Sequence, residues 1–354
     1  MQVIITSPSL DPAKNVSGIS AVVQFVMDNN PGVSYLHFEQ GRQDGEQGGL
    51  RRVITLLKSL KKWRTLLKSH PDDVIHYNLS LGWQSVLRDS IFLHFAKKHK
   101  TVIHVHGGNY LMVERKPLIF NKLLKRLFSK NVPFVVLSEL EKEKLRHDYN
   151  VKNIHVLPNC PDLRHVTEEK ALTTPDHNII MGYLGRICTD KGMPELLAAC
   201  AELKAQNVDF TLKMAGSEVA SDYVQQFQNL LKSQFEYLGV VSGQEKSAFL
   251  QSLDVFVLPS YYEGLPMRLL ESMSFGVVPV CTNVGSIGEV VENNVNGLFV
   301  GTHSSQDIVN KIQELHADRE LLHTLSLQAA QTIREHFNPR KYIQTLNDLY
   351  VSLP

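Results

Sequence analysis

The chain has 354 residues and carries 37 Lys and Arg against 36 Asp and Glu, a formal charge of only +1. Its hydrophobic fraction of 43% and charged fraction of 21% exclude disordered and fibrous classes, and its length suggests two domains. The small net charge argues against a dedicated nucleic-acid-binding protein, in which a large basic excess is expected.

Short β-rich runs alternate with helical segments along the chain. The first series of predicted strands comprises Val3–Thr6, Val33–Phe38, Val74–Tyr77, Thr101–His106, Phe134–Leu137 and Ile154–Leu157. The second series comprises Ile179–Leu184, Phe210–Met214, Glu236–Leu238, Asp254–Leu258, Val277–Val280 and Leu298–Val300. Among the predicted helices are Met193–Gln206, Ser217–Leu231 and Pro266–Ser274. Because these strands are apolar on both faces, they predict parallel sheets covered by helices on both sides.

Two sets of about six strands fit an α/β fold of two Rossmann-like, doubly wound domains. The boundary is expected in Leu163–Asn178, a polar stretch without apolar periodicity. The predicted domains are residues 1–165 and 178–336, followed by a terminal segment, 337–354. Ligands of doubly wound sheets bind beyond the carboxyl ends of the strands, so two such domains facing each other would form a cleft.

The net charge conceals an unequal distribution between these halves. Residues 1–177 contain 25 Lys and Arg against 17 Asp and Glu, an excess of +8. Residues 178–354 contain 12 against 19, which gives −7, and the two sums add to +1. This division predicts domains that face different partners, one of them an acidic surface. Drift of surface charge is the alternative.

Two basic segments account for the positive half. Arg51–Lys68 contains seven Lys and Arg and Arg115–Lys130 contains six, neither has an acid, and both have apolar residues at helical spacing. They predict amphipathic helices that lie on an anionic membrane surface. Core-facing helices with a solvated basic face are the alternative.

Cysteine usage and the first residues bear on the compartment. The four cysteines have no spacing typical of a metal site and are expected to be reduced, as in a cytosolic protein. Neither a signal peptide nor an apolar stretch of 18 residues is found. The sequence therefore predicts a cytoplasmic protein, with peripheral attachment to the cytoplasmic face of a membrane left open.

Two cations follow the first strand of the second domain. Arg186 and Lys191 lie in the loop before the helix predicted to begin near Met193. A guanidinium matches phosphate oxygens and a lysine adds a mobile point charge, so this loop is predicted to bind a diphosphate. Two solvated surface cations are the alternative. A Gly-x-Gly-x-x-Gly after the first strand and a P-loop are both absent, which argues against dehydrogenases and P-loop proteins.

Two glutamates flank the start of the helix Pro266–Ser274. Glu263 lies in the preceding loop and Glu271 about one turn inside the helix, roughly 10 Å or more apart along the chain. The carboxylates of a retaining glycosidase are about 5 Å apart. This pair is better suited to two separate sets of hydroxyls on one extended ligand. A capping residue and an exposed helix carboxylate are the alternatives.

The first domain contributes weaker candidates. His106 ends a predicted strand and precedes two glycines that permit close approach of a ligand. Gly18 opens a helix after the first strand, where backbone amides can approach phosphate. Ser138 and Asn159 follow predicted strands, and each alone is typical of a helix cap or a turn. The nearby His76 and His104 are expected to pack within their strands, and no metal site is predicted.

Taken together, these motifs resemble glycosyltransferase family 4. In the second half the resemblance rests on closely spaced motifs: Gly185-Arg186, Lys191-Gly192, Glu263-Gly264-Leu265-Pro266, Glu271-Ser272-Met273, Gly276, Pro279, Gly285, Glu289 and Asn296-Gly297. In the first half it is looser, and rests on Gly18, His106-Gly107, Ser138-Glu139 and Pro158-Asn159. The family has the GT-B fold, with the active site between two Rossmann-like domains and a terminal helix that crosses back, as the segment 337–354 would.

The resemblance implies a retaining hexosyl- or N-acetylhexosaminyl-type transferase. It would use a nucleotide-sugar donor, with uridine diphosphate expected, and no obligatory metal or other cofactor. A lipid-linked or polysaccharide acceptor in cell-surface glycan biosynthesis, such as lipopolysaccharide or capsule, would lie on the side of the first domain. Sugar-nucleotide epimerase activity on the same fold, and a non-catalytic sugar-nucleotide-binding role in a glycan assembly complex, are the alternatives.

The resemblance also implies roles for individual residues. Arg186 and Lys191 would hold the diphosphate and stabilise the leaving group. Glu263 would bind hydroxyls of the transferred sugar and Glu271 the ribose, while the backbone of Gly264, Leu265, Pro266 and Met267 meets sugar and phosphate. His106 would lie by the reacting centre, and Gly18 would let its loop close over the phosphates. Ser138 and Asn159 are candidates on the acceptor side.

Three departures from the family pattern concern glycines. The first loop has one glycine where two are common, Cys160-Pro161 follows Asn159 where a glycine is usual, and Ser286-Ile287-Gly288 replaces a more glycine-rich turn. The first departure weakens the predicted phosphate contact of Gly18, and the last is expected to alter the donor pocket.

Overall fold

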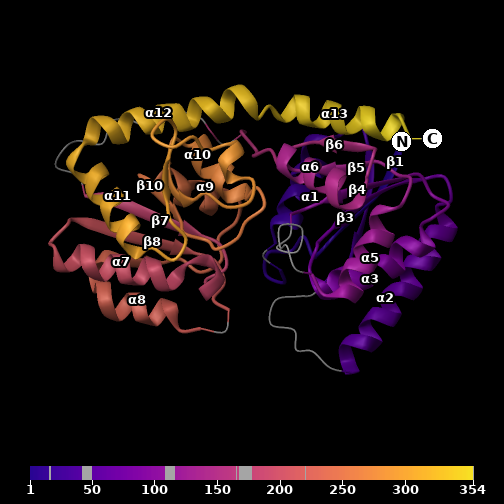
Figure 1. Ribbon diagram of the computed structural model, residues 1–354, viewed down its shortest axis with the longest axis horizontal. Helices are drawn as coiled ribbons and strands as arrows, with labels where there is room; N and C mark the ends of the chain where they lie inside the picture. The colour runs from indigo at the N-terminus through magenta and orange to yellow at the C-terminus, as the bar shows by residue number, and fades with distance from the viewer. Residues whose placement is uncertain are drawn as a thin grey trace. The chain divides into compact units, whose positions relative to one another are not determined.

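The computed structural model describes residues 1–15, 17–41, 50–107, 116–164, 166, 178–219 and 221–353. The chain divides into two compact units, shown in Figure 1. Unit 1 comprises Met1–Asn159 and Arg340–Pro354, and unit 2 comprises Cys160–Pro339. Every strand predicted from the sequence is present, with ends displaced by at most two residues. The α/β fold class with two doubly wound parallel sheets is confirmed.

Unit 1 contains a parallel six-stranded sheet of order β2-β1-β3-β4-β5-β6. Its strands are β1 (Gln2–Ser7), β2 (Ser34–Glu39), β3 (Val74–Leu79), β4 (Thr101–Val105), β5 (Phe134–Val136) and β6 (Ile154–Val156). Its helices are α1 (Gly18–Asn29), α2 (Leu50–Ser69), α3 (Trp83–Phe95), α5 (Leu118–Phe128), α6 (Glu139–Tyr149) and α13 (Pro339–Val351).

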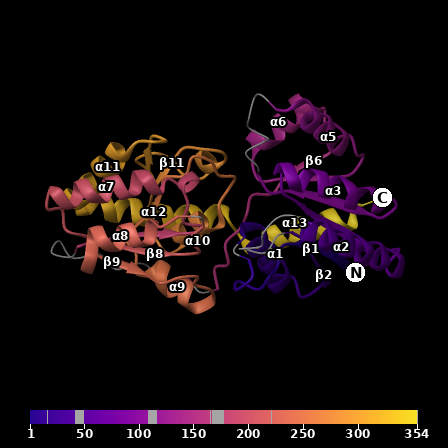
Figure 2. The ribbon, with the colours of Figure 1, turned by 90° about the horizontal axis from the view of Figure 1, so that it is seen from below.

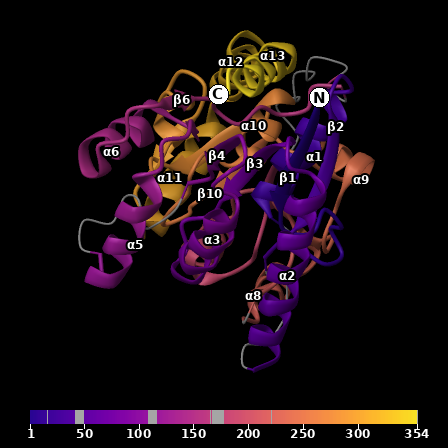
Figure 3. The same ribbon diagram turned by 90° about the vertical axis from the view of Figure 1, so that its right-hand side faces the viewer.

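The two faces of this sheet differ in chemistry because side chains alternate along each strand. One face of β3 and β4 is apolar and packs against Trp63 of α2, Phe92 of α3 and Phe120 of α5. Helix α3 lies between α2 and α5 on this side (Figure 3). On the other face, α13 lies beside α1 (Figure 2), where the rings of Phe25 and Tyr342 meet edge to face at 5.4 Å.

Unit 2 contains a parallel sheet of order β12-β11-β10-β7-β8-β9. Its strands are β7 (Ile179–Leu184), β8 (Phe210–Ala215), β9 (Phe235–Tyr237), β10 (Val255–Leu258), β11 (Val278–Thr282) and β12 (Leu298–Val300). Helices α7 (Met193–Ala205), α8 (Tyr223–Leu231) and α11 (Ser305–Ala317) form one layer, and α9 (Gly243–Gln251), α10 (Met267–Ser274) and α12 (Arg319–His336) form the other (Figure 1).

One predicted helix, Ser217–Leu231, begins too early. The observed α8 starts at Tyr223, because the preceding residues pair with the loop after β7. The amide of Ile187 donates to the carbonyl of Ser217 at 2.8 Å, and the amide of Val219 donates back to Ile187 at 3.0 Å. Because the backbone groups of Ser217 and Val219 already form these hydrogen bonds, this segment cannot also form the first turn of a helix.

The basic segments form α2 and α5, and each has a buried apolar side, as the alternative of core-facing helices predicts. Trp63 and Leu67 of α2 are buried, as core-facing helices require. Val53 and Leu57 are exposed, although their spacing predicted the same apolar stripe. Gly108–Arg115, with the first residue of the second basic segment, lies outside the described residues. Across the part of the chain that the structure describes, no helix has the length and apolarity needed to cross a bilayer.

Candidate functional site

The loop after β7 carries the two cations predicted to bind phosphate. Arg186 is exposed, and its backbone carbonyl accepts a hydrogen bond of 2.6 Å from the hydroxyl of buried Tyr183. Lys191 ends a short 3-10 helix, η1 (Thr189–Lys191), and only 13% of its side chain is exposed. Lys191 is therefore not the mobile surface charge that the sequence predicted, whereas Arg186 is exposed.

Lys191 is held by Glu263, the first glutamate of the predicted pair. Its Nζ donates to Oε1 of Glu263 at 2.7 Å and to the backbone carbonyl of Tyr262 at 3.3 Å. Oε1 also accepts a 2.7 Å hydrogen bond from the hydroxyl of Ser260 and pairs with Nη2 of Arg268. Oε1 of Glu263 therefore accepts from three donors. Through Lys191 it links the loop after β10 to the loop after β7.

The charges of this cluster keep Glu263 ionised. Burial acts to raise the pKa of the Glu263 carboxyl, but Arg268 and Lys191 outweigh it, so that the pKa lies below its usual range. Burial lowers the pKa of Lys191, and Glu263 only partly opposes this shift. One anion against two cations leaves the cluster with a positive excess.

Arg268 was not predicted from the sequence. It is the second residue of α10, and its side chain is 20% exposed. Its guanidinium packs on the backbone of Gly185, which has a φ of +146°; a methyl group there would lie 2.9 Å from Nη1 of Arg268. No motif or distinctive spacing in the sequence marks this arginine.

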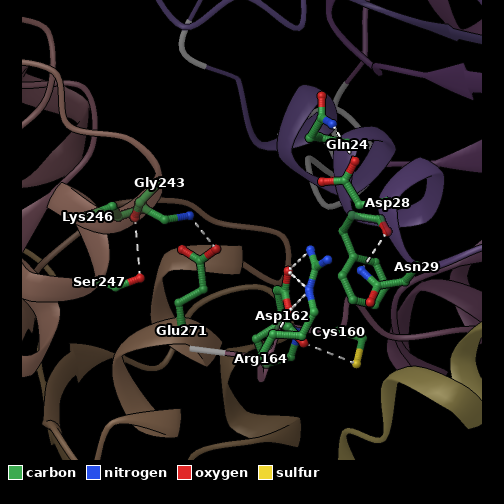
Figure 4. Close-up of polar contacts among 12 residues, drawn as sticks. Gln24, Asp28, Asn29, Cys160, Asp162, Arg164, Gly243, Lys246, Ser247 and Glu271 are labelled. Atoms are coloured by element: carbon green, nitrogen blue, oxygen red, sulfur yellow. Dashed lines mark hydrogen bonds and ion pairs between the residues drawn. The ribbon is translucent and has the colours of Figure 1, made fainter. Parts of the chain in front are cut away.

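The start of α10 and the second glutamate complete this part of unit 2. Pro266 precedes the helix and makes no side-chain cap hydrogen bond, and amides at the start of a helix can bind an anion. Glu271 lies one turn inside, as predicted. Its Oε1 accepts from Nζ of Lys246 of α9 at 2.7 Å, and Figure 4 shows the two side chains pointing toward one another.

The candidate histidine of unit 1, His106, lies one residue past the end of β4. Its Nε2 lies 2.5 Å from Oδ1 of Asn78, and its ring lies 4.1 Å from that of His104 between centroids. Burial, together with a smaller effect of His76, lowers the pKa of His106 to about 3. His76 and His104 are both buried within their strands, as predicted.

The remaining candidates of unit 1 have local structural roles. Gly18 begins α1, and a methyl group at Gly18 would meet nothing within 4 Å, so its surroundings are open. Ser138 caps α6, its hydroxyl accepting from the amide of Glu141 at 3.1 Å, which confirms the capping interpretation. Asn159 is buried at the boundary of unit 1.

Comparison with known proteins indicates the kind of enzyme to which these loops belong. Residues 166–332 match the family model described as glycosyl transferases group 1. An Escherichia coli protein named UDP-Gal:alpha-D-GlcNAc-diphosphoundecaprenol alpha-1,3-galactosyltransferase is 24% identical over 323 residues, which cover 86% of this chain and 82% of that protein. A Campylobacter jejuni N,N'-diacetylbacillosaminyl-diphospho-undecaprenol alpha-1,3-N-acetylgalactosaminyltransferase is 31% identical over 169 residues, 47% of this chain and 44% of that protein.

Solved structures agree on the fold across the whole chain. Sucrose-phosphate synthase from Thermosynechococcus elongatus has a TM-score of 0.78 at 19% identity and covers 99% of this chain and 98% of its own. Anabaena Alr3699/HepE in complex with UDP-glucose has a TM-score of 0.77 at 17% identity, with all of both chains covered. These likenesses confirm the predicted GT-B type of fold. Residues 166–332 thus match the glycosyl transferases group 1 model, and the chain is a glycosyltransferase.

Proposed function

We propose that the chain transfers a sugar, with retention of anomeric configuration, from a UDP-linked donor to a hydroxyl of a lipid-linked or polysaccharide acceptor. The relatives support the acceptor class: the Escherichia coli and Campylobacter jejuni proteins are named for diphospho-undecaprenol acceptors, and a Staphylococcus aureus relative is named for capsular polysaccharide biosynthesis. The donor base is suggested by the first of these names and by the UDP-glucose complex of Alr3699/HepE.

The observation that carries this proposal is the group of cations gathered at Glu263 in unit 2. Lys191, Arg268 and Glu263 share one carboxylate oxygen and sum to +1, and the exposed Arg186 adds a second positive charge. A diphosphate carries about two negative charges and needs such an uncompensated excess. The amides at the start of α10 add partial positive charge for the same anion.

Each residue of the site then has its own role in the transfer. Arg186 and Lys191 hold the diphosphate and stabilise the charge that develops on it as the glycosidic bond breaks. Glu263, fixed at Oε1 by its three donors, offers its other oxygen to hydroxyls of the transferred sugar. Glu271, oriented by Lys246, binds the ribose. The backbone of Gly264, Leu265, Pro266 and Met267 meets sugar and phosphate.

In unit 1, His106 contacts the sugar and Gly18 lets its loop approach the phosphates. Ser138 and Asn159 lie on the acceptor side. No residue is assigned as a covalent nucleophile, so the donor phosphate itself receives the proton of the acceptor hydroxyl.

A panel of nucleotide sugars tests this function. Full-length protein is incubated with UDP-galactose, UDP-glucose, UDP-N-acetylglucosamine, UDP-N-acetylgalactosamine and GDP-mannose, each with polyprenyl-diphosphate-linked N-acetylglucosamine. We expect one UDP sugar to be transferred and the product to keep the α configuration of the donor, read from its anomeric NMR coupling. Because Arg186 and Lys191 supply the positive charge, we expect transfer to persist in EDTA.

Other results would contradict the proposal in recognisable ways. A product of inverted configuration would exclude retention, and transfer from GDP-mannose alone would exclude the UDP donor. Epimerised nucleotide sugar formed without acceptor would indicate an epimerase. Binding of nucleotide sugars without turnover would indicate a non-catalytic partner.

We also propose that unit 1 binds peripherally to an anionic membrane at the cytoplasmic face, where a lipid-linked acceptor would be located. Helices α2, α3 and α5 expose large apolar side chains, among them Leu57, Leu87, Leu118 and Ile119, and the exposed fraction of Leu118 is 88%. Exposed lysines, including Lys58, Lys61 and Lys62, accompany them on α2. Apolar side chains beside cations are the combination that an anionic bilayer surface binds.

Flotation with phosphatidylcholine vesicles, with and without phosphatidylglycerol, measures this binding. Replacing Lys58, Lys61 and Lys62 together by Gln is expected to weaken binding to anionic vesicles on the order of 100-fold, since each lysine contributes about 1 kcal/mol. Replacing Leu57, Leu118 and Ile119 by Ser should weaken binding to both kinds of vesicle. Val351→Ser, at an exposed valine of α13, is the control and should change nothing. Equal flotation of all variants would refute the proposal.

A further inference from the structure

Neighbouring strands of unit 1 align four polar side chains on one face of the sheet. His76 and Asn78 are two residues apart on β3, and His104 and His106 are two apart at the end of β4. The register places Asn78 opposite His104. Side chains two residues apart share a face, so these four, which we call the β3–β4 polar row, lie together.

The hydrogen bonds of Asn78 fix the orientation of its amide group. One end of the amide lies 2.9 Å from the backbone carbonyl of Thr6. A carbonyl only accepts, so this end must be the donating Nδ2. Oδ1 therefore faces Nε2 of His106 at 2.5 Å. Because an amide oxygen also only accepts, Nε2 of His106 must carry a proton.

The rest of the β3–β4 polar row favours a neutral ring. The His106 imidazole packs on that of His104, whose Nδ1 lies 3.2 Å from Nε2 of His76. His76 in turn contacts the Tyr350 hydroxyl of α13 at 2.6 Å through Nδ1. Among the described residues no carboxylate pairs with any of these three rings, so nothing offsets the cost of charging them. A neutral imidazole protonated at Nε2 has a lone pair at Nδ1.

We propose that Asn78 is a positioning residue of the transferase. It holds His106 in the Nε2-protonated form, so that Nδ1 accepts a hydrogen bond from a hydroxyl of the substrate. The inference rests on the proposed function, in which His106 contacts the sugar. It also restricts the ligand group, because an unprotonated nitrogen bonds to a hydroxyl but repels an unprotonated phosphate oxygen.

Nitrogen-15 NMR of histidine-labelled full-length protein reads the protonation state directly. Long-range correlations show which ring nitrogen carries the proton, and the His106 signals are identified by their loss in His106→Gln. We expect a single Nε2-protonated form in the wild type. Asn78→Leu has a similar shape but no acceptor, and should give a mixture of both tautomers. Its kcat should fall about tenfold or more, the effect of one hydrogen bond to a polar partner.

A second variant separates positioning from a merely structural role. Asn78→Asp keeps the acceptor but, like Asn78→Leu, loses the bond to Thr6. We expect the proton to stay on Nε2 and the new carboxylate to favour a charged ring, with His104 and His76 opposing it. Transfer should then be impaired at low pH and recover as pH rises and Nδ1 loses its proton. A purely structural Asn78 would make the two variants behave alike, at every pH.

The chain supplies a matched control. His155 and Asn153 form an exposed imidazole–amide contact of 2.8 Å in the same unit, and Asn153→Leu should leave kcat unchanged. The inference is overturned if His106 is protonated at Nδ1 in the wild type, or if Asn78→Leu keeps one tautomer or the wild-type rate. If the wild type turns over no nucleotide sugar, the proposed function fails and the role in transfer fails with it, whereas the spectra still decide the tautomer.

Discussion

Replacing Lys191 by Met is expected to lower kcat for transfer about 10²- to 10³-fold, the usual effect of removing one group that stabilises developing charge. The fold should survive this change. Glu263 keeps Arg268 and Ser260 at the same carboxylate oxygen, so no buried anion is left unpaired. The loss should therefore appear in turnover of the donor rather than in the free energy of unfolding, which we expect to change by about 1 kcal/mol.

The measurement compares kcat and thermal unfolding of Lys191→Met with those of Lys213→Met. Lys213 is a second lysine of unit 2 that is mostly buried, and it pairs with Glu236 at 3.5 Å on neighbouring strands β8 and β9. The control should keep its activity. Wild-type turnover by Lys191→Met would remove Lys191 from the donor site, and a collapse of stability would show that its role is structural.

A methyl group at Gly285 should strongly destabilise unit 2. Gly285 has a φ of +59°, and a Cβ there would lie 1.9 Å from the backbone carbonyl oxygen of Glu263. Backbone cannot swing aside as a side chain can. The left-handed conformation costs roughly 1–2 kcal/mol and the overlap about 1–3 kcal/mol, so Gly285→Ala should lower the free energy of unfolding by about 2–5 kcal/mol. Transfer should be lost as well, since Glu263 must move.

Gly239→Ala is the matched control, because Gly239 has a φ of +68° but open space within 4 Å. Gly239→Ala should lower the free energy of unfolding only by the cost of the left-handed conformation, roughly 1–2 kcal/mol. Both tryptophans, Trp63 and Trp83, lie in unit 1, so their fluorescence does not report on unit 2. Amide hydrogen exchange in β10 and β11 is the suitable measurement. Equal losses in the two variants would show that the carbonyl of Glu263 does not constrain this position.

The strands could be predicted because each is a short run of apolar residues between turn residues, a pattern set by burial on both faces. The helix Ser217–Leu231 could not be bounded, since the bridge between Ile187 and Glu218 that delays α8 joins residues distant in sequence. In the same way, an apolar spacing alone did not reveal that Trp63 is buried while Leu57 of the same stripe is exposed. Such outcomes depend on which neighbour covers the helix.

The sequence predicted which residues belong to the candidate site, but not which of them pair with one another. Loops after strands indicated Lys191 and Glu263, and the helix after the second loop indicated Glu271. They did not indicate that Lys191 binds Glu263 or that Lys246 binds Glu271. Arg268 stayed hidden because a lone arginine at a helix start has no distinctive spacing. Asn78 could have been found: His76-x-Asn78 and His104-x-His106 share a two-residue period at the ends of two successive predicted strands, although Asn78 lies one residue past the predicted end of the first.

Unit 1 is formed by two segments that are far apart in the sequence, and this affects the order in which the chain can fold during synthesis. Tyr350 of α13 covers His76 of β3, and the 180 residues of unit 2, Cys160–Pro339, are translated between β6 and α13. Unit 2 is continuous, so the ribosome can release it complete. Unit 1 emerges first but cannot close over His76 until the final turns of α13 have left the exit tunnel. Of the two units, the one whose synthesis begins first is thus the one that finishes folding last.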